Sequence, residues 1–433
     1  MASVSPTLIT PPAAGADTQQ RYTSALSAVT TLFFLWGFIT CLNDILIPYL
    51  KAIFQLSFAQ ANLINGCFFG AYFLMSIPAG KLVARVGYKR GMLVGFAVAA
   101  VGAYLFYPAA AHRAYGLFLG ALFVLASGIT ILQVAANPYV AILGPAKSAS
   151  ARLTLTQAFN SLGTFLAPLL GSALILSKLP KTVDAASAAS IDVTAVQVPY
   201  LIIGTVLLVI SLLLSRVHLP QITHAPAAAS AAPGTGSPWQ YRHLVLGVVG
   251  IFAYVGAEVA IGSHIVNYLA LPDVLGLSPA AAGQQVAKYW FAAMLGRFAG
   301  AYLLNKFAPA KLLAFNAAGA IALVLLSINS SGALAMWSLL AVGLMNSLMF
   351  STIFTLAVAG LGRHTEQASG LLCTAIVGGA VVPLLFGVVA DHQGLRLALL
   401  LPVLCYGYIL WYGLRGSKNV LAPPEMLNPG NIS

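Results

Sequence analysis

Two acidic residues lie inside long apolar stretches, one in each half of the chain. Asp44 is the only charged residue between positions 22 and 50, and Glu258 is the only acid between positions 244 and 272. A carboxylate at membrane depth costs at least about 2.5–3.5 kcal/mol, so such a residue faces protein or water and marks a functional site. Asn43 adjoins Asp44 and adds a carbonyl oxygen. The sequence therefore predicts a functional site shared between the two halves, with Asp44, Glu258 and Asn43 as candidate ligands of a cation.

Amide side chains recur at helical spacing in the first half. Gln133 and Asn137 are four residues apart and Gln157 and Asn160 are three apart, so each pair shares one face of a helix. An amide donates to one hydroxyl and accepts from another, which suits a sugar. The alternative is that these amides only join helices to one another. The predicted substrate-binding residues are Trp36, Asn43, Asp44, Gln133, Asn137, Gln157, Asn160, Glu258, Tyr289, Trp290 and Asn346.

The part played by Glu258 stays open at this point. It either accepts hydrogen bonds from substrate hydroxyls or completes the cation site with Asp44. A structural explanation also exists, because His264 and Lys288 lie in the same half and are candidates to pair with it.

The composition places the chain in a membrane. Of its 433 residues, 60% are hydrophobic and 7% are charged, whereas soluble domains carry about 25% charged residues. The net charge of +12 comes without a basic run that would indicate nucleic-acid binding. The four cysteines lie in apolar segments without the spacing of a metal site or a disulfide framework. Paired catalytic carboxylates, a nucleophile with its base, and a cofactor motif are also missing, so neither an enzyme nor a cofactor is expected.

Apolar runs of about 20 residues, the length that crosses a bilayer, recur along the chain. Polar connectors at 177–198 and 218–238 interrupt them, and the second is rich in Pro, Ala, Ser and Gly, which is typical of a flexible linker. We expect an all-α membrane protein with twelve transmembrane helices at about 26–50, 59–84, 91–110, 115–143, 152–176, 199–216, 243–270, 280–305, 311–329, 333–360, 367–390 and 396–414.

Short segments of the first half recur in the second. Leu46–Leu50 resembles Ile265–Leu269 at an offset of 219, and Pro168–Leu170 recurs as Pro383–Leu385 at an offset of 215. The near-constant offset predicts two pseudo-symmetric six-helix bundles. The expected organisation is a disordered tail at 1–25, a bundle at 26–217, a cytoplasmic linker at 218–238, a second bundle at 239–414 and a tail at 415–433.

Basic residues predict the orientation, because cytoplasmic loops carry an excess of Lys and Arg. With the N-terminus inside, 15 of the 21 Lys and Arg fall on the cytoplasmic side, and both termini are expected there. These are Arg21, Lys81, Arg85, Lys89, Arg90, Lys147, Arg152, Arg216, Arg242, Arg297, Lys306, Lys311, Arg363, Arg415 and Lys418.

The loop between the second and third predicted helices, Gly80–Arg90, resembles the major facilitator signature G-x-L-x-D-R-x-G-R-K. Ala84 replaces its acid, so the usual bond from that acid to a neighbouring helix end is not expected. In the family this loop takes part in conformational gating. The predicted gating residues are Gly80, Arg85, Gly87, Lys89 and Arg90.

Several motifs resemble one family within that superfamily, the fucose–galactose–glucose cation symporters. Phe33–Trp36 with Leu42–Leu46, Ala135–Val140 and Gln157–Ser161 match its helices 1, 4 and 5. Fucose-transporting members carry a helix 4 acid where this chain has Gln133, so the glucose/galactose branch, with some members regarded as sodium-dependent, is the closer match. The resemblance implies alternating-access import of a hexose such as glucose, galactose or fucose, or a close derivative.

The same resemblance implies a monomer in the bacterial inner membrane, with the sugar, a coupling cation and the lipid bilayer as its partners. The cation is Na⁺ or H⁺, with a slight preference for Na⁺. A multidrug or other small-molecule antiporter of the same fold is the alternative.

Overall fold

The computed structural model describes residues 23–38, 41, 58–174, 194–217, 219 and 237–418. Regular structure in these ranges is helical throughout. Nine stretches within them are long and apolar enough to cross a membrane. The predicted linker and both predicted tails fall largely outside the described residues, as do Asn43 and Asp44.

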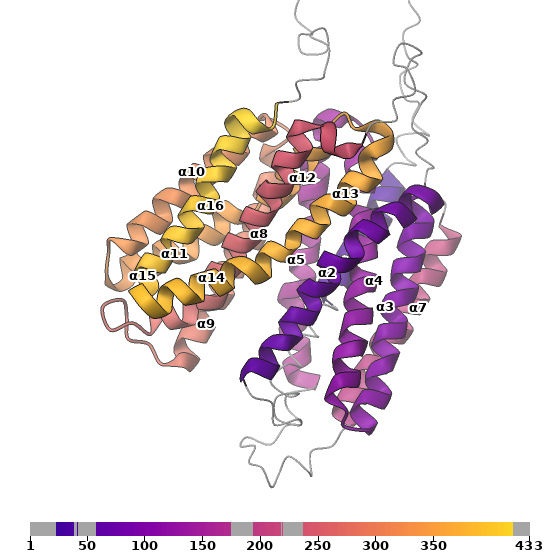
Figure 1. Cartoon of the computed structure of the whole chain (residues 1–433), viewed down its shortest axis with the longest axis horizontal. Helices are drawn as coiled ribbons and strands as arrows, with labels where there is room; N and C mark the ends of the chain where they lie inside the picture. Colours follow the sequence, from indigo (N-terminus) through magenta and orange to yellow (C-terminus); the bar gives the residue numbers. More distant parts are fainter. Residues whose placement is uncertain are drawn as a thin grey trace, which may run out of the picture.

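The N-terminal helices pack side by side as one bundle (Figure 1, indigo to magenta). Within it, α3 lies against both α4 and α7, while α2 packs on α4. The bundle contains an apolar helix at Thr23–Phe38 and the helices α2 (Phe58–Val86), α3 (Tyr88–Ala111), α4 (Tyr115–Ile142), α5 (Ala149–Leu174) and α7 (Thr194–Arg216).

The C-terminal helices form the second bundle (Figure 1, red to yellow). Its helix α8 contacts most of the others, including α14, α16 and α12. The members are α8 (Arg242–Leu269), α9 (Pro279–Leu303), α10 (Pro309–Ile328), α11 (Gly332–Asn346), α12 (Met349–Val358), α13 (Thr365–Thr374), α14 (Gly378–Gln393), α15 (Leu395–Ala398) and α16 (Leu400–Trp411).

Three of the predicted C-terminal spans are interrupted rather than continuous. The tenth is divided between α11 and α12 by a break at Ser347 and Leu348, and the eleventh is divided between α13 and α14 by a 3₁₀ turn at Ala375–Val377. The twelfth consists of α15 and α16, followed by a π-helical turn at Tyr412–Gly416. Apolar length alone did not reveal these breaks. The first break matters for the site, because the carbonyl oxygen of Ser347 lies at it and accepts a hydrogen bond from Arg297.

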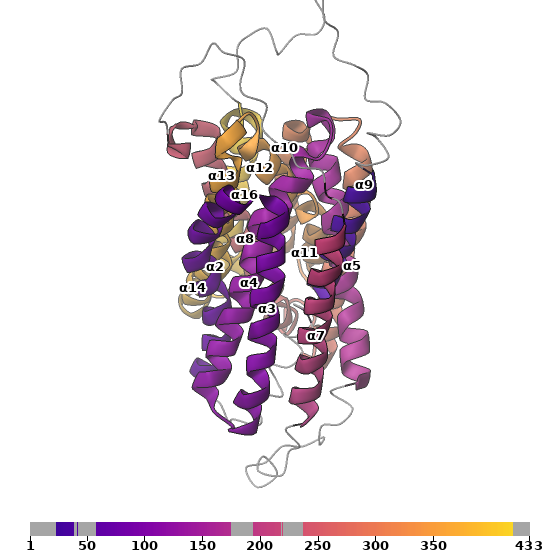
Figure 2. The ribbon, with the colours of Figure 1, turned by 90° about the vertical axis from the view of Figure 1, so that its right-hand side faces the viewer.

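The two bundles face each other, with the N-terminal one in front in Figure 2. They touch through α2 with α13, and through α5 with α9 and α12. Small residues make the α2–α13 crossing close: a Cβ added to Gly370 would lie 2.7 Å from the Ser76 carbonyl oxygen, and one on Gly80 would lie 3.1 Å from that of Glu366. Ser369 Oγ donates to the Val134 carbonyl oxygen at 2.9 Å. One end of the interface is therefore sealed by backbone-level contacts.

Hydroxyl pairs extend this seal between α5 and α12. Ser150 and Thr355 share a hydrogen bond of 2.6 Å, and Thr154 and Ser351 share one of 2.5 Å. These residues and the α2–α13 crossing lie toward the helix ends that meet the loops after α2, α4 and α12. The sealed end is thus the end that the basic residues predict to be cytoplasmic.

The loop after α2 lies at this end. Gly87 has a φ of 84°, a left-handed conformation that favours glycine, and it turns the chain from α2 into α3. Lys89 Nζ donates to the Ser215 carbonyl oxygen of α7 at 2.8 Å, which ties the loop to its own bundle.

Candidate functional site

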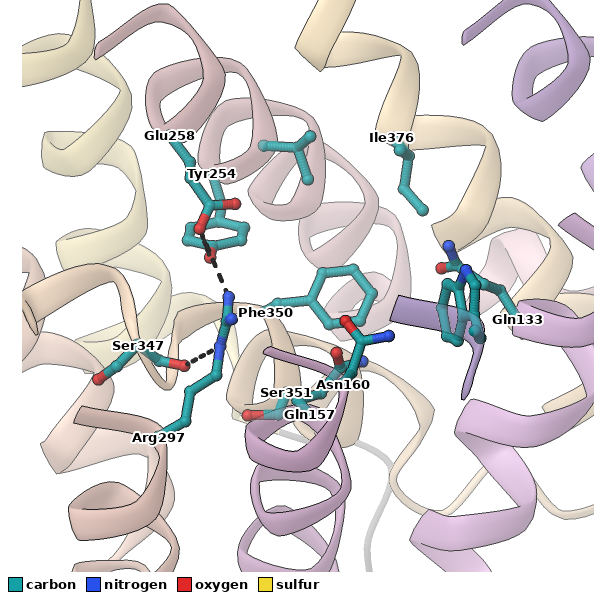
Figure 3. Close-up of a pocket in the computed structure, with 12 residues that line it drawn as sticks. Gln133, Gln157, Asn160, Tyr254, Glu258, Arg297, Ser347, Phe350, Ser351 and Ile376 are labelled. Atoms are coloured by element: carbon teal, nitrogen blue, oxygen red, sulfur yellow. Dashed lines mark hydrogen bonds and ion pairs between the residues drawn. The ribbon is translucent and has the colours of Figure 1, made fainter. Parts of the chain in front are cut away.

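A cavity of about 180 Å³ lies between the two bundles, among the residues that the structure describes (Figure 3). Both halves contribute to its wall. The lining residues are Trp36, Gln133, Gln157, Asn160, Tyr254, Val255, Glu258, Arg297, Ser347, Phe350, Ser351 and Ile376.

Helix α5 and the first helix build one side of the cavity. They pack at backbone distance, since a Cβ added to Gly37 would lie 2.2 Å from the Asn160 carbonyl oxygen. Asn160 Nδ2 donates to the Phe33 carbonyl oxygen at 2.8 Å, which reinforces this contact. Gln157, three residues earlier on α5, is half-buried and has no side-chain hydrogen bond to any described residue. Its amide is therefore available to a ligand.

Helix α4 adds Gln133, which is nearly buried with 7% of its surface exposed. Its Nε2 donates to the hydroxyl of Tyr72 on α2. Its amide is therefore partly committed inside the bundle while it still borders the cavity (Figure 3).

The opposite side carries a charged pair. Arg297 Nη2 on α9 lies 3.5 Å from Glu258 Oε1 on α8, with 15% and 12% of the two side chains exposed. The Tyr254 hydroxyl, one turn before Glu258, donates to the same oxygen at 2.8 Å. The rest of this side combines apolar Val255, Phe350 and Ile376 with two serines, Ser347 and Ser351.

Arg297 also reaches beyond Glu258. Its Nε donates to the Ser347 carbonyl oxygen at 3.3 Å, where the break between α11 and α12 lies (Figure 3). Its Nη1 donates to Ser161 Oγ on α5, across the interface between the halves. Gly296 makes this reach possible, because a Cβ there would lie 2.6 Å from Ser347 Cβ. The guanidinium thus joins two C-terminal elements to the N-terminal half.

The profile of the Major Facilitator Superfamily matches residues 25–383. The chain belongs to the major facilitator superfamily. The "Glucose/galactose transporter" of Brucella abortus (strain 2308) is 56% identical over 403 residues, which are 93% of this chain and 96% of the relative. The "L-fucose-proton symporter" of Escherichia coli K12 is 35% identical, covering 91% and 93% of the two chains. This transporter is thus no enzyme.

A solved structure also matches this major facilitator protein. The crystal structure of the transporter FucP in the outward conformation superposes with a TM-score of 0.84 at 34% identity, covering 92% of this chain and 100% of that one. The expected fold, two bundles of a twelve-helix major facilitator protein, is confirmed.

Five of the predicted substrate residues of this major facilitator protein line the cavity: Trp36, Gln133, Gln157, Asn160 and Glu258. Two others, Asn43 and Asp44, lie outside the described residues. The remaining four, Asn137, Tyr289, Trp290 and Asn346, do not border the cavity.

These four residues occupy two kinds of position. Asn137, Tyr289 and Asn346 are fully buried. Asn346 Nδ2 donates to the Tyr289 hydroxyl at 2.8 Å, which in turn donates to the Glu258 carbonyl oxygen at 3.4 Å. This pair supports the helix that presents Glu258. Trp290 is 40% exposed and packs near Gly262 on α8. The rings of Tyr289 and Trp290 pack edge to face, with their centroids 5.1 Å apart, and neither residue borders the cavity.

The neighbours of Glu258 differ from those considered from the sequence. Lys288 lies 4.9 Å above the ring of Trp337, and His264 Nδ1 lies 2.8 Å from the Ala260 carbonyl oxygen. Arg297 is the partner instead. The orientation prediction counts Arg297 on the cytoplasmic side, and the structure places it in the cavity wall, more than one turn before the end of α9 at Leu303. Two features of the sequence could have pointed to these partners of Glu258. Tyr254 precedes it by four residues, and Arg297 is the single Arg of α9.

Proposed function

We propose that this protein imports a neutral monosaccharide together with a proton by alternating access. The observation that carries the proposal is the cavity between the halves, where amides of α4 and α5 face a charged pair on α8 and α9. Neutral donors and acceptors of this kind match sugar hydroxyls, and Trp36 and Phe350 supply rings for the apolar face of a sugar. The names of the glucose/galactose and fucose relatives support the same substrate class.

A proton is the coupling ion that the comparisons favour, since the E. coli relative is named as a proton symporter. The slight preference for sodium has no support in them. We assign the proton to Asp44, with Asn43 beside it, because the carboxylate of Glu258 already has a guanidinium partner. The drug-antiporter alternative is disfavoured by a cavity smaller than the roughly 300–1,000 Å³ that is usual for drug-sized ligands.

The topology follows the same proposal. The sealed end, with the Gly80–Gly370 crossing, faces the cytoplasm together with both termini and the linker at 218–238. The predicted gating residues Gly80, Arg85, Gly87, Lys89 and Arg90 then form or adjoin the cytoplasmic gate in the inner membrane. Substrate enters from the opposite side and leaves when this seal opens.

Uptake into proteoliposomes tests the proposal. Labelled D-glucose, D-galactose and L-fucose are offered in counterflow, and then with an inward pH gradient in sodium-free buffer. We expect at least one sugar to exchange and to accumulate above equilibrium when the pH gradient is present. No exchange of any of the sugars would refute the sugar assignment, and accumulation that needs sodium would refute the proton assignment.

A further inference from the structure

We propose that Arg297 recognises the sugar, acting with Glu258 as one donor–acceptor pair that binds adjacent hydroxyls. The inference rests on the proposed sugar transport. It also assigns Glu258 to substrate recognition and removes it from the cation site. Three features of the described residues support it.

The first feature is the place that Arg297 occupies. A cation held by Glu258 would need the space beside the carboxylate, where the Arg297 guanidinium lies 3.5 Å from Oε1. Like charges at such separation repel each other, and more strongly in a partly desolvated cavity than in water. The guanidinium therefore occupies the Oε1 side of the carboxylate and disfavours a second cation beside it.

The second feature is the hydrogen-bonding capacity that remains. A guanidinium has five N–H donors, and the bonds to Glu258, Ser161 and Ser347 use one each. On Glu258, Oε1 is engaged by Arg297 and Tyr254, while Oε2 has no partner among the described residues. The pair thus offers a free acceptor and free donors side by side at the cavity wall. Neighbouring hydroxyls of a sugar need this combination.

The third feature is the surroundings of the pair. The other C-terminal side chains at the cavity include apolar Val255, Phe350 and Ile376, so Arg297 and Glu258 carry the charge on this side. A sugar bound between this pair and Gln157 would be oriented by those of its hydroxyls that hydrogen-bond to Arg297 and Glu258. Arg297 also donates to Ser161 on α5. A sugar that moves the guanidinium would therefore change a contact with the N-terminal half.

The test combines variants with deoxy sugars in proteoliposomes. Affinities of the wild type, Arg297→Gln, Arg297→Lys and Glu258→Gln are measured by counterflow for the best sugar and for its monodeoxy analogues. In the wild type, at least one analogue should bind about tenfold more weakly or worse, because a site built for a hydroxyl rejects the analogue that lacks it. Each variant should bind the parent sugar about tenfold more weakly or worse, and its discrimination against that analogue should disappear. Sugar-elicited proton uptake at saturating sugar should persist.

A purely structural part for Arg297 would give a different pattern. It would weaken binding of the parent and of every analogue by the same factor and leave the discrimination intact, which overturns the inference. Unchanged sugar affinity with lost proton uptake would also overturn it, because Glu258 would then belong to the coupling site. Failure of the wild type to exchange any sugar would instead refute the proposed function.

Two further variants complete the design. Lys288→Gln removes the other cation of α9, which lies over Trp337 away from the cavity, and should leave affinity and discrimination unchanged. A variant that removes one charge leaves the other buried without a partner and can fail to fold. In that case the double variant Glu258→Gln/Arg297→Gln removes both charges together. The same loss of discrimination is expected of this double variant, and its persistence would again overturn the inference.

Discussion

An amide in a membrane helix binds a ligand only if its hydrogen-bonding groups are not already used by the protein. Gln157 and Asn160 share one face of α5, but Asn160 Nδ2 bonds the Phe33 carbonyl oxygen while Gln157 has no partner among the described residues. Gln133 lies between these cases, since it donates to Tyr72. The three amides should therefore contribute differently, although their sequence pattern is the same.

Replacing Gln157 by alanine is expected to weaken sugar binding with little effect on stability. The lost partner of a partly buried hydroxyl costs about 1–3 kcal/mol, or roughly 5- to 150-fold in affinity. Counterflow measures the affinity, and thermal unfolding of the purified protein measures stability. Asn316→Ala is the matched control, because Asn316 Nδ2 bonds the Met345 carbonyl oxygen between α10 and α11. It should lower the unfolding temperature and leave the affinity unchanged. Unchanged affinity in Gln157→Ala together with weakened affinity in Asn316→Ala would contradict the assignment of Gln157 to the sugar site.

Tyr289→Phe should show the opposite behaviour to Gln157→Ala. Removing the hydroxyl leaves the buried Asn346 amide without its acceptor, which costs about 1–3 kcal/mol of folding free energy. Discrimination among deoxy sugars should not change, because Tyr289 does not border the cavity. Unfolding and counterflow together check this. Lost discrimination with normal stability would return Tyr289 to the binding site.

The sequence located some of these residues and missed others for a physical reason. Spacing identifies a shared helix face, as for Gln157 and Asn160, but not whether that face meets a cavity or another helix. Asn137 fits the same pattern and is fully buried. Arg297 was counted only as a basic residue of the cytoplasmic side, and its place in the cavity wall was not predicted. Its reach depends on the break after α11 and on Gly296, which only the packing reveals.

At the scale of elements, the α2–α13 crossing joins the bundles through glycine. The sequence singled out Gly80 as part of a gating signature, but its partner Gly370 on α13 carried no comparable signal. Because a Cβ on Gly370 would lie 2.7 Å from a backbone oxygen of α2, the crossing has no room for a larger residue. The hydroxyl pairs between α5 and α12 can separate without leaving an unpaired charge. The seal is therefore tight in packing yet able to open.

Gly370→Val is expected to weaken this seal and shift the protein toward a state that opens at the same end. Distances between spin labels at His364 and Lys89, on the two sides of the sealed end, should increase on average. Gly387→Val is the control, since a Cβ there meets nothing within 4 Å. Its distance distribution should match that of the unsubstituted protein. An unchanged distribution in Gly370→Val would mean that the crossing does not hold the seal.

At the scale of the molecule, corresponding positions of the two halves line the cavity with different side chains. Trp36 and Val255 are 219 residues apart, Gln133 and Phe350 are 217 apart, and Asn160 and Ile376 are 216 apart. These offsets fall close to those of the repeated sequence segments, and all six residues line the cavity. At two of these three pairs the first half carries an amide, Gln133 or Asn160, where the second half carries an apolar side chain, Phe350 or Ile376. The two sides of the cavity therefore differ in chemistry although they come from corresponding positions.

Under the proposed function, this division assigns the proton to the N-terminal half. Among the described residues Glu258 is the one acid at the cavity, and Arg297 neutralises it, so we predict that Asp44 carries the coupling charge. A charge that moves inward gains about 2.3 kcal/mol per 100 mV of membrane potential. Asp44→Asn cannot exchange a proton and should abolish accumulation against a gradient, while counterflow, which needs no net proton movement, survives.

Uptake of the labelled sugar with and without an imposed pH gradient checks this prediction. Glu258→Gln is the matched comparison, because it also replaces a membrane acid by its amide. It should accumulate sugar whenever enough is supplied to overcome its weaker binding. If Asp44→Asn accumulates sugar like the wild type and Glu258→Gln does not, the coupling charge lies on the C-terminal half, and Arg297 must then release the carboxylate during transport.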